Sequence, residues 1–389
     1  MRVIIVNKFA YGTGGADHQC LATAAALRQR GHEVVFLATA SPWNLVEDGV
    51  FVRARVDHAT RDAIPVTHRV QIAAAAFWNR DAARAMRSLA ERFRPDVVHA
   101  HKLYPQLSVA PIATASHLGI PVVQTLHDYE LMSASALDAG GSWLDHDETR
   151  LDYKVLNTLT FPLRRTLHVR CVAFWITVSR YVADAYSRSG IHARVLPNFA
   201  TPEFTAEFDQ PSFERRHGAV FIGRLVPEKG VRDVLALARL LPELPIKIVG
   251  RGPLSEEVAA HADQLPNVTY VGELEHTEVP SLIQGARVAL VPSRWDEPGS
   301  LAALESMACG TPVAAYPRGG LAEYVRGSGG GVVTEIERPE ALAEASLRLH
   351  RDRDLWQDCS RRGLEAMADM HSRDHHVDRL ETIYEEARR

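Results

Sequence analysis

The chain has 389 residues, enough for two domains that each bury a core of their own. Its 44 basic and 48 acidic residues give a formal net charge of −4, which offers no general case for nucleic-acid binding, because that needs a concentrated basic surface. The four cysteines lack metal or disulfide spacing, and no apolar run approaches the roughly 20 residues of a membrane span. With no signal-peptide pattern at the N-terminus, the sequence predicts a cytoplasmic protein.

Compact apolar runs separated by amphipathic segments organise the first part of the chain. Such runs are typical of strands buried in a parallel sheet, and we predict them over 3–6, 33–38, 95–101, 121–128, 175–179 and 193–196. Helices are predicted over 16–30, 69–91 and 180–189. Residues 131–170 are interpreted as a loop followed by helices, with a mobile surface loop at 139–148. The Pro197–Asn198 turn then marks the end of a domain over residues 1–198.

A second series of strands and helices begins at Ala219. Its apolar runs predict strands over 219–222, 246–249, 268–271, 288–291 and 312–315, and so a second doubly wound domain over residues 199–373. The last segment, 374–389, has apolar residues at helical spacing, which predicts an amphipathic helix. The predicted fold class is therefore α/β, with two facing doubly wound domains and an active site in the cleft between them.

A glycine-rich loop, Tyr11 to Gly15, follows the first predicted strand. It fails the dinucleotide-binding fingerprint G-x-G-x-x-G, which would need a glycine at Asp17, and no acidic residue closes the second strand. A nicotinamide-dependent dehydrogenase is therefore disfavoured. The loop still lies at the carboxyl end of a strand, where open α/β sheets bind ligands. A plain tight turn is the other interpretation.

The stretch from Asp296 to Thr311 joins a predicted strand to a predicted helix. Ser300 suits an N-cap, and the helix-forming run after it ends at Gly310. A helix start presents unpaired backbone N–H groups and the positive end of the helix dipole, so it can bind an anion. Glu297 precedes these amides, and Glu305 lies about 7.5 Å further along the helix.

This order of groups matches the layout of a nucleotide sugar. Glu297 could meet the sugar, and Glu305 could accept hydrogen bonds from the ribose hydroxyls. The diphosphate would meet the backbone amides at Gly299, Ser300 and Leu301. The alternative is a helix start with two solvated glutamates.

Two cations lie in the loop 223–230, after the first strand of the second domain. Arg224 can grip phosphate oxygens with a planar fork and Lys229 supplies a mobile charge, so the pair suits a diphosphate leaving group. Because both lie in a loop, removing either is expected to lower turnover more than stability. Gly250 and Gly252 mark a turn after the next strand. Two exposed cations on a turn would be the alternative interpretation.

Together these motifs resemble the signature of the retaining glycosyltransferases of family 4, the glycosyl transferases group 1, which have the GT-B fold. The likeness runs from Arg2 to the C-terminal tail. The family pattern E-P-F-G-L, followed by three residues and a second Glu, is matched from Glu297 to Glu305, except that Gly299–Ser300 stands where Phe–Gly is expected. Residues 223–230 are similar to the family's G-R-L-x-x-E-K-G, whose Arg and Lys bind the donor phosphates.

The resemblance extends to three further segments. Gly14 and Gly15 match a Gly–Gly pair that lies against the donor diphosphate or the acceptor, and 250–253 matches a turn at which the nucleotide approaches the backbone. Gly319–Gly320 with Glu323 resemble the family's G-G-x-x-E, for which we predict a structural role. The resemblance also implies that the helix over 374–389 packs back on the first domain.

Three histidines follow or end predicted strands of the first domain. A lone histidine is more often structural than catalytic, and this interpretation is favoured for His99 and, less strongly, for His101. His127 lies in a T-L-H-D sequence, on the side of the sheet where Gly14 and Gly15 emerge. That setting resembles the family's histidine, which lies near the anomeric carbon of the donor and contacts the sugar.

A basic amphipathic stretch near residues 163–170 has a second possible role. It could touch an anionic membrane surface, although a solvated helix face is the favoured interpretation. Its cationic or titratable residues are Arg164, Arg165, His168 and Arg170.

The resemblance implies a retaining transfer of a sugar from a nucleoside diphosphate sugar, with UDP favoured and GDP possible. The acceptor would be a hydroxyl or amine of a glycan, a glycolipid or a secondary metabolite. Arg224, Lys229 and the helix start would stabilise the departing diphosphate, Glu297 would hold the sugar and His127 would orient it. Neither a metal nor a cofactor is predicted, because no cluster has ligand spacing. The alternatives are a nucleotide-sugar epimerase of the same architecture and a catalytically silent nucleotide-sugar-binding protein.

Overall fold

The structure is a computed structural model that describes residues 1–53, 74–132, 151–205 and 212–389, with only the backbone for 151–157. The predicted surface loop at 139–148 lies outside the described residues. The chain forms two compact units. Unit 1 comprises Met1–Val178, Val182–Leu196 and His376–Arg389, and unit 2 comprises Ser179–Tyr181 and Pro197–His375.

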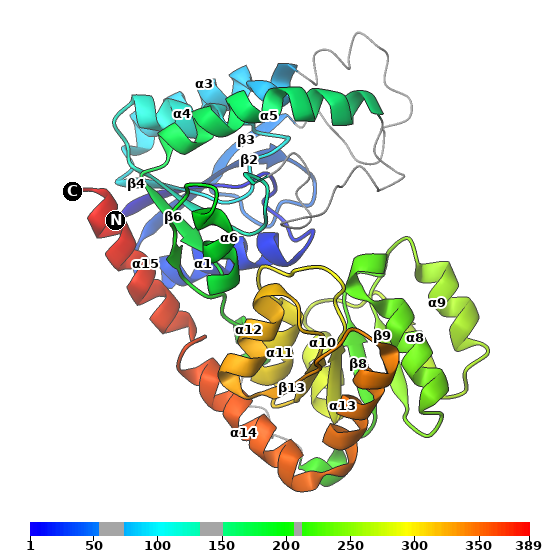
Figure 1. The fold of residues 1–389 in the computed structure, drawn as a ribbon. Coiled ribbons are helices and arrows are strands. Elements are labelled where there is room, and N and C mark those ends of the chain that lie inside the picture. The colour runs from blue at the N-terminus through cyan, green and yellow to red at the C-terminus, as the bar shows by residue number, and fades with distance from the viewer. Residues whose placement is uncertain (54–73, 133–150, 206–211) are drawn as a thin grey trace. The chain divides into compact units, whose positions relative to one another are not determined.

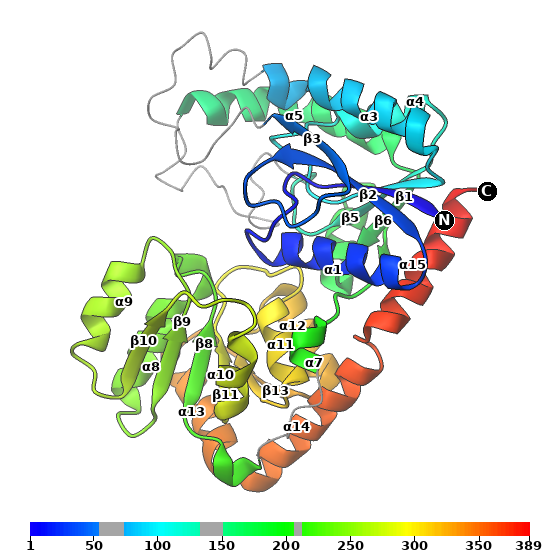
Figure 2. The same cartoon turned by 180° about the vertical axis from the view of Figure 1, so that it is seen from behind.

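Unit 1 is a parallel α/β sheet with the strand order β3-β2-β1-β4-β5-β6-β7. Its strands are β1 (Arg2–Val6), β2 (Glu33–Ala40), β3 (Gly49–Arg53), β4 (Val97–Ala100), β5 (Val122–Leu126), β6 (Phe174–Thr177) and β7 (Arg194–Val195). Helices α3 (Arg80–Phe93), α4 (Ala110–His117) and α5 (Leu151–Cys171) lie on one face, and α1 (Gly15–Gln29) lies on the other (Figures 1 and 2). α6 (Arg180–Ser187) follows β6. This doubly wound arrangement confirms the predicted α/β class.

Unit 2 repeats the same design with the order β10-β9-β8-β11-β12-β13. Its strands are β8 (Ala219–Ile222), β9 (Ile246–Val249), β10 (Val268–Gly272), β11 (Val288–Val291), β12 (Val313–Ala315) and β13 (Gly331–Val333). One core packs the sheet against α8 (Val231–Leu240), α9 (Ser255–Ala262) and α13 (Pro339–Arg351). The other packs it against α7 (Pro202–Thr205), α10 (Val279–Gly285), α11 (Leu301–Ala308), α12 (Gly319–Ser328) and α14 (Arg353–Ala368). Successive strand residues alternate between the two cores, as a sheet covered on both faces requires.

Two strands, β3 and β13, were not predicted from the sequence. β3 pairs with β2 in the register Phe36↔Gly49, and β13 pairs with β12 in the register Val313↔Gly331. Both are short, and both begin with a glycine, a residue that sequence patterns associate with turns. These two segments therefore form strands because a neighbouring strand pairs with them in the folded chain, which no local pattern predicts.

The helix predicted over 69–91 is wrong in its extent. Within the described residues, α3 begins only at Arg80, after a break at 78–79. Asn79 causes the break: its side chain accepts hydrogen bonds from the backbone N–H groups of Asp81 and Ala82, both at 3.0 Å. It also donates to the carbonyl of Gln106 at 2.8 Å. A buried N-cap thus starts a new helix where periodicity alone suggested a continuous one.

The basic stretch in α5 is only partly a solvated face, and the prediction that its cationic residues lie on the surface is wrong for Arg164 and His168. Arg164 and His168 are buried; the guanidinium of Arg164 lies 3.8 Å from the centre of the Tyr104 ring. Nε2 of His168 lies 2.5 Å from Oε1 of Gln124, and burial lowers the pKa of His168 to about 3. Arg165 donates to two backbone carbonyls. The exposed face of α5 instead carries Leu159, Leu163 and Arg170.

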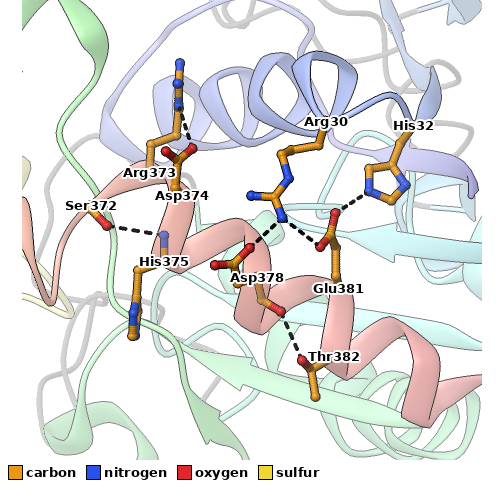
Figure 3. A network of polar contacts seen from close by, with 9 residues as sticks. All are labelled: Arg30, His32, Ser372, Arg373, Asp374, His375, Asp378, Glu381 and Thr382. Atoms are coloured by element: carbon orange, nitrogen blue, oxygen red, sulfur yellow. Dashed lines mark hydrogen bonds and ion pairs between the residues drawn. The ribbon is translucent and has the colours of Figure 1, made fainter.

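The C-terminal helix α15 (Arg373–Ala387) begins in unit 2, and from His376 onward it belongs to unit 1. Figure 3 shows its attachment to the loop after α1. The Arg30 guanidinium donates to Asp378 at 2.5 Å and to Glu381 at 3.2 Å, and Nε2 of His32 lies 2.7 Å from Glu381. The chain end is therefore an integral part of unit 1.

Candidate functional site

The predicted donor-binding residues of unit 2 follow the carboxyl ends of three neighbouring strands. Arg224 and Lys229 follow β8, Gly250 and Gly252 follow β9, and the segment with Glu297 follows β11. β8 and β11 are adjacent in the sheet, and the strand order reverses between them. Ligands of open parallel sheets bind at such a point, because loops from both sides of the reversal diverge there.

An ion pair lies at the centre of this group. Lys229 is in a short 3-10 helix, Pro227–Lys229, and its Nζ lies 2.6 Å from Oε1 of Glu297. The Glu297 side chain is 3% exposed and that of Lys229 is 27% exposed. The ammonium also lies 5.8 Å from the centre of the Trp295 ring. The pair therefore has a buried acidic end and a cationic end that solvent or a ligand can reach.

Two serines complete the environment of Glu297. Ser293 and Ser300 are both buried, and each donates its hydroxyl hydrogen to the carboxylate. Burial alone would raise the pKa of Glu297, but the charge and hydrogen bond of Lys229, together with the two serine hydroxyls, lower it below its ordinary value. Glu297 is thus held as a carboxylate inside the protein. Sequence reasoning missed Ser293, whose only signal is its position two residues after the end of β11.

Ser300 has a second role, as the predicted N-cap of α11. Its backbone is extended, and its Oγ accepts a hydrogen bond from the N–H of Ala303 at 3.4 Å. The hydroxyl can serve Glu297 and the helix together because it is both donor and acceptor. In the family pattern a glycine stands at this position. Ser300 therefore adds a hydroxyl beside the carboxylate of Glu297.

Arg224 differs from Lys229 in its surroundings. Its side chain is exposed and forms no ion pair within the described residues. Gly250 has φ +133°, and a side chain there would collide with the carbonyl of Gly223. At Gly252 a Cβ would lie 2.5 Å from the carbonyl oxygen of Leu225. Close backbone packing of the two loops accounts for both glycines, and contact with a nucleotide stays a prediction.

Glu305 lies in α11, half-buried and near Glu203. Burial, reinforced by the charge of Glu203, raises its pKa to about 8. Within the described chain its carboxylate has no hydrogen-bond or ion-pair partner. Glu297 and Glu305 look equivalent in the sequence, but their pKa values are shifted in opposite directions.

The Gly319–Gly320 pair packs against the backbone of the Glu297 segment. The N–H of Gly320 donates to the carbonyl of Glu297 at 2.6 Å, and a Cβ on Gly320 would collide with the carbonyl of Pro298. The Glu323 carboxylate accepts two backbone hydrogen bonds at 2.9 Å, from Arg180 and Tyr181. These contacts are structural, and the pair fixes the path of the loop that carries Glu297.

In unit 1, Gly14 and Gly15 begin α1, after β1. The carbonyl of Gly14 accepts from the N–H groups of Asp17 and His18 at 3.0 and 3.1 Å. Asp17 is buried and accepts hydrogen bonds from Asn7 at 2.9 Å and from Thr13. This aspartate therefore holds the glycine loop in place.

The three histidines lie at the ends of β4 and β5. His99 is buried with both ring nitrogens bonded, Nδ1 to the Tyr384 hydroxyl at 2.7 Å and Nε2 to the Thr125 hydroxyl at 2.8 Å. This arrangement agrees with the predicted structural role of His99. Nδ1 of His101 lies 2.8 Å from Nε2 of His127. His127 is therefore not a lone histidine but one member of a pair.

A polar cluster surrounds the same strand ends of unit 1. Nζ of Lys102 lies 2.7 Å from Asp128. Burial and the neighbouring charge of Asp128 raise the pKa of Glu130 to about 7, although Arg164, Lys102 and Lys8 oppose that rise. Carboxylates and cations are thus available together to a polar ligand. Sequence reasoning missed this cluster because its members come from separate loops.

The described residues contain no group of three or more His, Cys, Asp or Glu side chains placed to hold a metal ion. Among the helices that the structure describes, none combines the length and apolarity needed to cross a bilayer.

The fold matches those of solved glycosyltransferases. Sucrose-phosphate synthase from Thermosynechococcus elongatus is 18% identical, with a TM-score of 0.71 over 99% of this chain and 98% of that one. Anabaena HepE in complex with UDP is 15% identical, with a TM-score of 0.68 over 99% of this chain and 100% of that one. These similarities confirm the GT-B fold.

Family models then identify the chain. Residues 203–366 match the family described as glycosyl transferases group 1, and residues 13–204 match the one described as Glycosyltransferase Family 4. The protein belongs to this family and is a glycosyltransferase, as the motifs implied. Among its relatives, the 2-deoxystreptamine N-acetyl-D-glucosaminyltransferase of Streptomyces fradiae is 29% identical over 80% of this chain and 76% of the relative.

Proposed function

We propose that the protein transfers a sugar, with retention of anomeric configuration and without a metal ion or other cofactor, from a nucleoside diphosphate sugar to an acceptor hydroxyl or amine. The observation that carries the proposal is the Lys229–Glu297 pair beside the capped N-terminus of α11. A buried carboxylate, a partly exposed ammonium and a helix start are the groups that a sugar linked to a diphosphate needs.

The chemistry assigned to these residues is electrostatic. Negative charge grows on the diphosphate as the glycosidic bond breaks, and Lys229, Arg224 and the amides at Ser300 stabilise that charge. Glu297, held ionised by Lys229 and two serines, accepts hydrogen bonds from sugar hydroxyls. Glu305 receives the ribose, and His127 orients the sugar. A donor phosphate oxygen takes the acceptor proton, so no side chain needs to act as nucleophile.

UDP is the favoured donor nucleotide and GDP the second choice. Anabaena HepE, which shares this fold, was solved in complex with UDP, and this supports placing UDP before GDP. The acceptor is assigned to the polar cluster of unit 1, where the Lys102–Asp128 pair and Glu130 offer both charges to hydroxyl or amine groups. An aminocyclitol, in keeping with the name of the Streptomyces fradiae relative, joins a glycan and a glycolipid in the acceptor panel.

The first experiment is a thermal-shift panel of UDP, GDP, ADP and TDP, each alone and as common sugar conjugates, with the free nucleosides as controls. A ligand at 100 times its dissociation constant adds about 2.7 kcal/mol of stability. We expect a diphosphate to shift the melting temperature more than its nucleoside does. The Arg224→Ala variant should lose that difference.

The second experiment is transfer itself, with the anomeric configuration of the product read by NMR. Retention in an EDTA-containing buffer supports the proposal, and inversion contradicts it. Donor epimerisation without an acceptor would indicate the epimerase, and binding without turnover over the whole acceptor panel would indicate the silent binding protein.

A further inference from the structure

The His101–His127 pair has a geometry that allows only one proton between the two rings. The two ring planes differ by 19°, with centroids 5.1 Å apart, and Nδ1 of His101 lies 2.8 Å from Nε2 of His127, so the rings meet edge to edge. Burial, followed by the charge of Lys102, lowers the pKa of His127 to about 3, and burial lowers the pKa of His101 well below its ordinary range. Both rings are therefore neutral at pH 7, and each carries one N–H.

The far nitrogen of His101 decides which ring donates. Nε2 of His101 is buried and has no hydrogen-bond partner within the described structure. If His127 donated, the only proton of His101 would be on this Nε2, as a buried N–H without an acceptor. Orphaned buried N–H groups are rare in proteins, more so than unpaired acceptors. The opposite arrangement uses the His101 proton in the inter-ring bond and leaves only a lone pair unpaired.

We propose that His101 is a positioning residue that donates Nδ1–H to Nε2 of His127, and so fixes His127 as the tautomer with its proton on Nδ1. This inference rests on the proposed function, in which His127 contacts the donor sugar. With Nε2 occupied, His127 offers that sugar a neutral N–H donor at Nδ1 and cannot take a proton through Nε2.

The surroundings of His101 keep its ring in place. Its ring centroid lies 4.3 Å from that of His99, which is itself fixed by hydrogen bonds to Tyr384 and Thr125. The backbone carbonyl of His101 also accepts a hydrogen bond from the Gln124 side chain at 3.2 Å. His101 thus lies on a rigid support, as a residue that orients another side chain requires.

The test is the tautomer of His127, measured by long-range proton–nitrogen NMR on the full chain labelled with nitrogen-15 histidine. His127→Gln assigns the signals. We expect the His127 proton on Nδ1; a proton on Nε2 would overturn the inference. This readout does not depend on activity, so a wild-type protein that transfers no sugar yet shows the Nδ1 tautomer would refute the proposed function and leave the positioning role standing.

Two matched variants connect the tautomer with turnover. His101→Asn keeps an amide N–H near the position of Nδ1, whereas His101→Phe keeps a ring without a donor. We expect His101→Phe to lower kcat by about tenfold, the effect of one lost neutral hydrogen bond, and to yield a mixture of His127 tautomers. His101→Asn should keep most of the turnover and the Nδ1 tautomer. Equal kcat values for wild type and a folded His101→Phe would contradict the positioning role.

Discussion

Replacing Lys229 by methionine should destabilise the protein as well as inactivate it, in contrast to what its loop position suggests. The ammonium lies 2.6 Å from a carboxylate that is 3% exposed, so its removal leaves Glu297 buried with only two serine hydroxyls as partners. Breaking a fully buried pair costs about 3–5 kcal/mol. Because Lys229 is 27% exposed and Glu297 can protonate, we expect about 2 kcal/mol at pH 7.5.

The sign of the pH dependence follows from the lowered pKa of Glu297. A group whose pKa is depressed in the folded state contributes stability above its unfolded pKa, and that stability is lost as the pH falls through the folded value. Without Lys229, burial is no longer offset by a neighbouring cation and raises the pKa of Glu297, so the carboxyl protonates more readily as the pH falls. The destabilisation of Lys229→Met should therefore shrink to less than about 1 kcal/mol at pH 5.

The assay is urea unfolding of a double-mutant cycle with Glu297→Gln at both pH values. Glu297→Gln in the Lys229→Met background should recover about 2 kcal/mol at pH 7.5, while sugar transfer stays absent. Arg224→Met is the matched control, since this exposed cation of the same segment makes no ion pair within the described residues. Equal unfolding midpoints for Lys229→Met and Arg224→Met at pH 7.5, or strict additivity of the cycle, would refute this reasoning.

Four further outcomes are expected. Arg224→Ala should lower kcat by about 10²-fold with a stability change below about 0.5 kcal/mol, measured by transfer assay and thermal melting. Glu305→Gln should raise the free energy of unfolding by about 2 kcal/mol at pH 8 and by less at pH 5, because the raised pKa of Glu305 gives stability that is present below its unfolded pKa and lost as the pH rises through about 8. A flat difference between pH 5 and 8 would show that the wild-type carboxyl is not buried as described. Asn79→Ala should lower stability by about 1–2 kcal/mol in urea unfolding, with kcat unchanged, since it removes the cap of α3. EDTA should leave the transfer rate unaltered, and recovery of a lost rate by an added divalent cation would show a metal requirement.

Local patterns in the sequence were sufficient for the fold class and for the start of α11. Apolar runs without alternation marked the central strands, because strands covered on both faces need apolar side chains in both directions. Ser300 was identifiable as an N-cap because the cap is a contact between residues three positions apart, with the Ala303 N–H as donor. The motif resemblance supplied the family, and the family models agree.

Other features depended on contacts that no local pattern encodes. β3 and β13 exist because a neighbouring strand pairs with them, and the inward position of Arg164 depends on the Tyr104 ring. Periodicity identified α5 as a helix but could not tell which of its sides packs on the sheet.

The features of the candidate site also separate into those that the sequence showed and those that only the tertiary contacts decided. The spacing of the motifs showed which residues could bind a diphosphate, but it did not show which side chain each of these residues contacts. Lys229 and Glu297 are 68 positions apart and His101 and His127 are 26 apart, and each pair is joined only because adjacent strands of a parallel sheet end at the same edge. The opposite pKa shifts of Glu297 and Glu305 have the same origin, because burial and nearby charge are properties of the folded chain and not of the glutamate itself.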